Sequence, residues 1–195
     1  MQVIKLTDQN MRTYNGFQWE IGAQKEASGE GKLCSNGWFH AYESQLLAIM
    51  HNPIHGNFNN PRMFIADTLD GKILRDRQTK LGSSKMVLLR EMDIPEVTTT
   101  QRVAYGILCA LEVCMDKKLR LWASRWLSGE DRSGASAAEA AGWAMAGAAS
   151  AAARAAEAAG WAADAAGWAA ARAATAAAAD DILNLKLIAE KAMNY

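Results

Sequence analysis

Residues 86–114, MVLLREMDIPEVTTTQRVAYGILCALEVC, contain the change of pattern that decides the fold. Met86–Leu89 is a short apolar run typical of a buried strand. Thr98 and Gln101 then have the spacing of a helix capping box, in which each side chain pairs with the backbone N–H of the other residue. The apolar residues that follow recur at helical spacing and share one face: Val103, Ile107, Ala110, Leu111 and Cys114. Strands therefore come first and helices follow, which predicts an α+β protein.

Residues 1–97 are predicted to form an α+β domain with a small, mainly antiparallel sheet. Asp70-Gly71 joins two apolar runs and is a strong hairpin signal. A helix is expected from Glu43 to Met50, ending before Asn52-Pro53 because proline disfavours helical geometry in the residue before it. Trp19, Phe39 and Phe64 are expected to fill the core. Short extended runs supply the strands: Val3–Leu6, Gly16–Ile21, Trp38–Ala41, Met63–Ala66 and Lys72–Leu74.

Residues 98–134 are predicted to be connecting helices and a linker. The helix that begins at Thr98 is followed by a second, from Leu119 to Leu127. Ser128–Gly134 is rich in polar residues and glycine, and it is the clearest linker in the chain. The second helix places its bulky residues on one side: Leu119, Trp122, Ala123 and Trp126.

Residues 135–195 are predicted to be an alanine-rich helical domain. Alanine occupies 29 of the 45 positions from Ala135 to Ala179, and it is the best helix former. With a turn of about 100° per residue, the tryptophans and polar side chains fall in one stripe about 80° wide. The remaining face is alanine and glycine, which predicts unusually close helix packing within the chain or between two chains of a homodimer. Asp180-Asp181 is expected to cap a final amphipathic helix.

The charge and the apolar pattern disfavour several classes of partner. The 21 basic residues balance 21 acidic ones, so no net field attracts nucleic acid or an anionic membrane. No run of about 18 strongly apolar residues predicts a membrane span. The first residues do not have the pattern of a signal peptide. The three cysteines form no CxxC pair, which is consistent with reduced thiols in a cytosol.

The three histidines cluster near Cys34 in the first 55 residues. These four side chains could in principle surround zinc, but their spacing is irregular, and Pro53 is expected to keep two of the histidines off a common helix face. We therefore predict no metal and no cofactor. The polar loop that follows is rich in side chains that bind ligands. The candidate binding residues here are Trp38, His40, His51, His55 and Asn57.

The tryptophan stripe of the tail has two interpretations. Its tryptophans could fill a core, since aromatic side chains dominate core energetics. Alternatively, the stripe could be an exposed interface, because tryptophan and arginine are typical interface anchors. The candidate binding residues in that case are Trp143, Arg154, Trp161, Trp168 and Arg172.

The sequence contains no catalytic motif. It has neither a glycine-rich phosphate loop nor a GxSxG element. Glu91 and Glu96 follow an expected strand, where a catalytic carboxylate could lie, but solvated loop acids have the same appearance. A modest basic patch is expected around one hairpin, from Arg75, Arg77, Lys80 and Lys85.

Two stretches together resemble a signature of small phage and prophage proteins of unknown function, "GFQFEVG … LCxNGFHxC". The matching residues are GFQWEIG at Gly16–Gly22 and LCSNGWFHA at Leu33–Ala41, with an extra residue around Trp38-Phe39 and Tyr42 where cysteine is common. The resemblance implies a virus-encoded accessory protein that works in the host cytoplasm. We expect it to bind and inhibit a host protein or defence complex without catalysis.

A nucleotide-handling function is the alternative. The run from Gly37 to Met50 is loosely similar to a segment of ADP-ribosyltransferase-like folds, with Glu91 or Glu96 as the acid. The same module could instead be a sponge that holds a small signalling nucleotide between aromatic residues.

Overall fold

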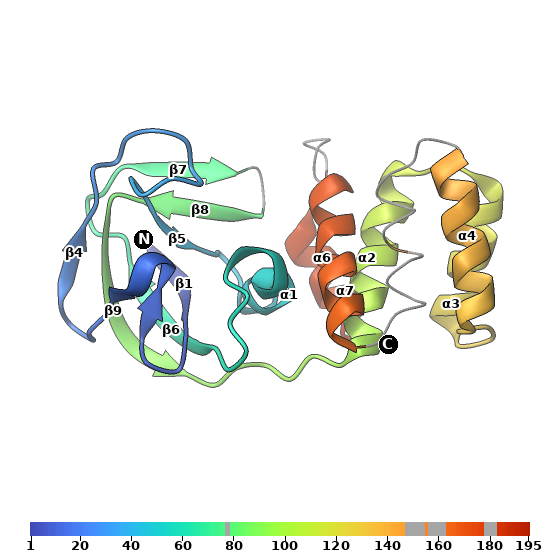
Figure 1. Cartoon of the computed structure of the whole chain (residues 1–195), viewed down its shortest axis with the longest axis horizontal. Helices are drawn as coiled ribbons and strands as arrows, with labels where there is room; N and C mark the ends of the chain where they lie inside the picture. Colours follow the sequence, from blue (N-terminus) through green and yellow to red (C-terminus); the bar gives the residue numbers. More distant parts are fainter. Residues whose placement is uncertain (77–78, 147–154, 156–162, 178–182) are drawn as a thin grey trace. The chain divides into compact units, whose positions relative to one another are not determined.

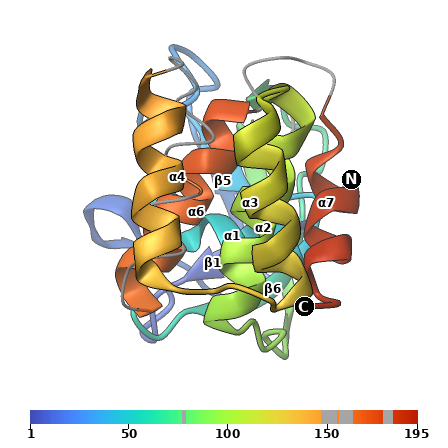
Figure 2. The ribbon, with the colours of Figure 1, turned by 90° about the vertical axis from the view of Figure 1, so that its right-hand side faces the viewer.

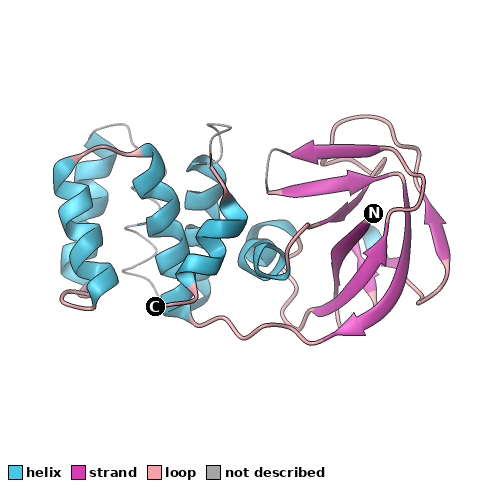
Figure 3. Cartoon of the chain, turned by 180° about the vertical axis from the view of Figure 1, so that it is seen from behind, coloured by secondary structure: helices cyan, strands magenta, loops and turns pink. Residues whose placement is uncertain are grey.

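The computed structural model describes residues 1–76, 79–146, 155, 163–177 and 183–195, and it divides into two compact units. The first is Met1–Glu96 and the second is Val97–Tyr195. Figure 3 shows antiparallel strands in the first unit, and in the second unit the described regular elements are all helices. The predicted α+β fold is therefore confirmed, and each unit is described by itself below.

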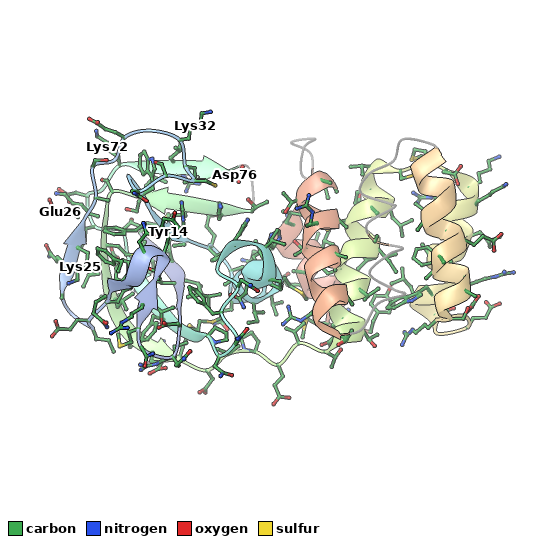
Figure 4. The ribbon with its side chains drawn as sticks, in the orientation of Figure 1. Tyr14, Lys25, Glu26, Lys32, Lys72 and Asp76 are labelled. Carbon is green, nitrogen blue, oxygen red and sulfur yellow. The ribbon has the colours of Figure 1, made fainter. Side chains whose placement is uncertain are left out.

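The larger sheet of the first unit has four strands, and every neighbouring pair is antiparallel (Figure 1). In Figure 4, Lys25 and Glu26 project from the strand at one edge of this sheet. Charged side chains on an edge strand discourage pairing with another chain. The strand order is β1-β6-β9-β4, formed by Gln2–Thr7, Arg62–Asp67, Lys85–Met92 and Gln24–Glu26.

The smaller sheet shows that the predicted hairpin at Asp70-Gly71 is wrong. Strand β6, before this turn, belongs to the larger sheet, whereas β7, after it, belongs to the smaller one. The turn itself forms, since the Gly71 N–H donates to the carbonyl of Thr68. The local turn residues thus predict that the chain reverses direction here, but they do not predict which strands pair. Strand β6 cannot pair with β7 because β1 and β9 already occupy both of its edges. The smaller sheet has the order β5-β8-β7, from Phe39–Ala41, Lys80–Ser83 and Ile73–Asp76.

The core of the first unit contains Trp19, Phe39 and Phe64, as predicted. Trp19 is 1% exposed, and its ring packs edge-on against Phe39 at 5.0 Å between centroids. The Trp19 indole N–H donates to the Thr13 hydroxyl, which satisfies its buried polar group. The other members of this cluster are Val3, Ala41, Ala66, Leu81, Met86 and Leu88.

Helix α1, Gln45–His55, continues through Pro53, so the predicted end before Asn52-Pro53 is wrong. A proline inside a helix removes one backbone hydrogen bond. Compensating bonds form at Asn52, whose side chain both donates to and accepts from the backbone of Phe58. The Asn52 carbonyl also accepts the N–H groups of Gly56 and Asn57. These bonds fix the last helical turn.

The second unit is built around α2, Thr99–Val113, which packs against α3, α6 and α7 (Figure 2). The predicted capping box at its start is confirmed. The Thr98 hydroxyl accepts the Gln101 N–H at 3.1 Å, and the Gln101 side chain accepts the Thr98 N–H at 2.9 Å. The remaining described helices are α3 (Lys117–Ser128), α4 (Gly134–Ala146), α6 (Ala163–Ala177) and α7 (Leu185–Ala192).

The alanine face of α6 packs within the chain, as one of the two predicted arrangements requires. A Cβ added to Gly106 of α2 would lie 3.0 Å from the Cα of Ala170, so the two backbones are in close contact. Arg172 and Thr175, from the polar stripe, are exposed. The face buried instead consists of Ala166, Ala169, Ala170, Ala171, Ala173, Ala174 and Ala177.

The predictions for α3 and α7 have different outcomes. In α3, the four residues predicted to share a face are all buried. In α7, the cap is Asn184, whose side chain accepts the N–H of Leu187 at 3.0 Å. The predicted cap, Asp180-Asp181, lies outside the described residues. Gln101 ties α7 to α2 by donating to the carbonyl of Met193.

Candidate functional site

A cavity of about 770 Å³ opens in the first unit between β1, β5, α1 and the short hairpin of β2 (Arg12–Thr13) and β3 (Phe17–Gln18). Its volume is that of a small-molecule site. No Asp or Glu is among its described lining residues. Its aromatic residues are Tyr14, Phe17, Trp38, Phe39, Tyr42 and Phe58. Its charged and polar residues include Lys5, Lys80, His40, His55, Cys34, Asn15 and Asn36.

Lys5 of β1 is the most unusual of the lining residues. The side chain is buried, with only 5% exposure, and its amine donates to the carbonyl of His40 at 2.6 Å. The ammonium also lies 5.0 Å from the centroid of the Trp19 ring. Among the described residues it forms no ion pair with a carboxylate. Burial lowers the pKa of Lys5 to about 7. A buried amine without a counter-ion is a ready site for an anion.

His40 of β5 points one ring nitrogen at the backbone. Its Nε2 lies in a very short contact with the carbonyl of Leu33. A carbonyl oxygen can only accept, so the ring proton of a neutral His40 is on Nε2 and its Nδ1 is an acceptor. Burial lowers the pKa of His40, and the nearby Lys5 and Lys80 lower it further. The ring is therefore neutral near pH 7.

His55, in the last turn of α1, is held by Tyr42. The Tyr42 hydroxyl lies 2.9 Å from His55 Nδ1, and the two rings stack. Burial lowers the pKa of His55 to about 3, helped by the charge of Lys80. His51 stacks on His55 at 5.4 Å between ring centroids, so these two histidines do share a helix face. The prediction that Pro53 separates them is wrong because α1 continues through the proline.

At the mouth of the cavity, Lys80 of β8 donates to the Cys34 sulfur at 3.2 Å. Cys34 is exposed, and it is one of three free cysteines. Lys80 is therefore the second positive charge of the cavity, and it lies in the half-buried rim rather than in the core.

The hairpin of β2 and β3 supplies aromatic side chains to the rim. Figure 4 shows Tyr14 on its turn, η1 (Tyr14–Gly16), and this side chain is 78% exposed. Asn15 has a positive φ of 56°, an uncommon conformation for a residue other than glycine. Phe17 packs against both Trp19 and Phe39, which joins the rim to the core.

The candidate residues of the first unit divide between the cavity and its surroundings. Trp38, His40 and His55 line the cavity, and the Trp38 indole donates to the carbonyl of Gly31. His51 is fully buried behind His55. Asn57 follows the helix with a positive φ of 50° and is not among the lining residues.

The candidate residues of the tail are only partly described. Arg172 is exposed on α6. Arg154 and Trp161 lie outside the described residues, as do the side chains of Trp143 and Trp168. The polar stripe of α6 is therefore exposed at Arg172.

The conceivable catalytic acids lie outside the cavity. Glu91 forms a two-bond ion pair with Arg62, at 2.7 Å from Nε to Oε1, and this lowers its pKa. Glu96 is exposed. Two residues of the expected basic patch pair with acidic side chains instead. Arg75 pairs with Glu43, and Lys85 pairs with Glu26 and Asp70. Arg77 lies outside the described residues.

Two negative findings hold for the part of the chain that the structure describes. No three His, Cys, Asp or Glu side chains gather there in a way that could hold a metal ion. No described helix has the length and apolar character needed to cross a membrane.

Sequence reasoning missed Lys5 and Tyr42. The signal for Lys5 was its place two residues after Val3, on the inward face of an apolar strand, where lysine is rarely found. Tyr42 continues the LCSNGWFHA motif but carries no local pattern that predicts a bond to a helix thirteen residues later.

Residues 1–100 match the family described as a domain of unknown function, DUF7666, and the chain belongs to this family. The match contains every described lining residue of the cavity. Neither the curated proteins nor the solved structures contain a match to this chain.

Proposed function

We propose that the first unit binds a small nucleotide in this cavity. The observation that carries the proposal is Lys5, a buried amine that opens on a ligand-sized cavity and has no described carboxylate partner. Keeping an ammonium buried is costly unless an opposite charge approaches it. A phosphate group supplies that charge and several acceptor oxygens.

The remaining lining residues suit the base of a nucleotide and add a second positive charge for its phosphate. Tyr14, Phe17 and Trp38 present aromatic rings at the cavity, and such rings stack on nucleobases. Lys80 adds a second positive charge near the mouth. Since no acidic side chain is among the described lining residues, an anion meets no repulsion there.

Binding is better supported than transfer of ADP-ribose. The acid that a transferase would need is not in the cavity, because Glu91 is paired with Arg62 and Glu96 is exposed elsewhere. A cavity with fixed cations and aromatic rings, but with no described carboxylate, favours a sponge that holds a small signalling nucleotide. The proposal requires no cofactor.

The test is calorimetric titration of the full chain with AMP, inorganic phosphate and adenosine. We expect AMP to bind more tightly than either fragment, and Lys5→Met to weaken AMP binding by about tenfold or more, as expected for loss of a charge-assisted hydrogen bond. The matched control is Lys25→Met on the edge strand β4, outside the cavity. Equal affinity of Lys5→Met and the wild type would contradict the proposal.

The proposed biological setting is a virus-encoded accessory protein in the cytoplasm of a bacterial host. Sequestering a signalling nucleotide would inhibit a host defence without catalysis.

A host protein bound by the tail is the second candidate, favoured by the exposure of Arg172 on the outward face of α6. Pairing of two chains through the alanine face has less support, since α6 uses that face to pack on α2. A pull-down from host lysate with Arg172→Glu as the control tests the second candidate.

A further inference from the structure

Two histidines in the cavity have their ring protons fixed by different partners. The proton of His40 is on Nε2, where it bonds the carbonyl of Leu33, and this leaves Nδ1 as an acceptor. For His55 the assignment depends on which group donates in its bond with Tyr42. Both residues line the cavity, and the other nitrogen of each ring has no partner among the described residues.

Tyr42 is the donor in that bond. Tyr42 is 5% exposed, and among the described residues the only hydrogen-bond partner of its hydroxyl is His55. A buried hydroxyl proton needs an acceptor, and Nδ1 of His55 is the acceptor at 2.9 Å. Burial raises the pKa of Tyr42 and lowers that of His55, so the hydroxyl stays protonated and the imidazole stays neutral. The His55 proton is then on Nε2, which is a donor.

We propose that His40 and His55 select an adenine nucleotide by reading the edge of its base. His40 Nδ1 offers one acceptor, and His55 Nε2–H offers one donor, with no described protein partner for either. The edge of adenine carries the complement, an amino-group donor beside a ring-nitrogen acceptor. Hypoxanthine, in IMP, has the same shape and phosphate but an oxygen acceptor and an N–H donor in exchanged positions.

Tyr42 is a positioning residue in this arrangement. It does not read the base itself; it sets which nitrogen of His55 carries the proton. Without the hydroxyl, neutral His55 can carry its proton on either nitrogen. Discrimination between the two bases then falls, while the charge of Lys5 and the contact with phosphate are unchanged.

The inference rests on the proposed function, and the test separates the two. Long-range ¹H–¹⁵N NMR of the histidine rings in the full chain should show both His40 and His55 protonated on Nε2. In Tyr42→Phe, His55 should become a mixture while His40 is unchanged. Tyr195→Phe is the matched control, since it makes the same change at an exposed tyrosine that is not among the lining residues of the cavity.

Calorimetry with AMP and IMP gives the second readout. We expect the wild type and Tyr195→Phe to prefer AMP by about tenfold or more, and Tyr42→Phe to lose most of that preference. Equal affinity of the wild type for AMP and IMP, or a His55 proton on Nδ1, would overturn the inference and leave the proposed function intact. Failure of both nucleotides to bind would overturn the proposed function and, with it, the selection of the base.

Discussion

At the scale of single residues, Lys5 is the side chain on which the proposed nucleotide binding depends. The strand periodicity places it on the inward face with Val3, so its burial follows from sequence. What it contacts does not follow, because His40 and Trp19 reach it from distant segments. The same is true of Tyr42 and His55. Local motifs in the sequence identified Trp38, His40 and His55 as candidates. The groups that bond to these side chains could be identified only from the tertiary structure.

The depressed pKa of Lys5 gives a prediction for stability. In the unfolded chain the amine titrates near its ordinary pKa of 10.5, and in the folded chain near 7. Between these values the unfolded state binds more protons, so the unfolding free energy should rise with pH. Below about pH 7 both states are protonated, and the cost of burying the charge is constant and at its full value.

Urea unfolding at pH 7, 8.5 and 10, followed by NMR signals of β1 and β6, measures this dependence. Lys5→Met removes the titrating group, so the stability of the wild type relative to this variant should increase from pH 7 to pH 10. A difference that stays constant over this range would show that Lys5 is not held in the environment described.

At the scale of elements, the sequence predicted what local chemistry controls. The capping box at Thr98 and the buried face of α3 are confirmed because both depend on spacing within one helix. The hairpin at Asp70-Gly71 and the end of α1 before Pro53 are wrong because strand partners and the Asn52 side chain override the local signal. Alanine content predicted helices in the tail but could not reveal that α6 packs on Gly106.

The close contact between α2 and α6 gives a prediction for packing. Ala170 is 1% exposed and lies against Gly106, so Ala170→Leu should overpack the contact and lower the unfolding free energy of the second unit by about 1–3 kcal/mol. Ala138→Leu makes the same change at an exposed position of α4 and should cost little. Denaturant melts of both variants decide the matter. Tolerance of leucine at 170 would mean that the alanine face of α6 is not the packed one.

At the scale of the whole molecule, a DUF7666 domain over residues 1–100 precedes a helical unit that extends to Tyr195. The described lining residues of the cavity all fall within the family domain. The fold class could be predicted because apolar periodicity changes once along the chain. The cavity could not, since its described lining comes from five separated segments of the first 80 residues.

The most direct test of the central claim is an NMR titration of the full ¹⁵N-labelled chain with AMP. The indole N–H of Trp38, which lines the cavity, is a reporter with a signal of its own. We expect saturable shifts of this signal and of the amides of His40 and Gly56, with the signals of α2, α3 and α7 unchanged. An unchanged Trp38 indole at millimolar AMP, or shifts confined to the helices of the second unit, would contradict it.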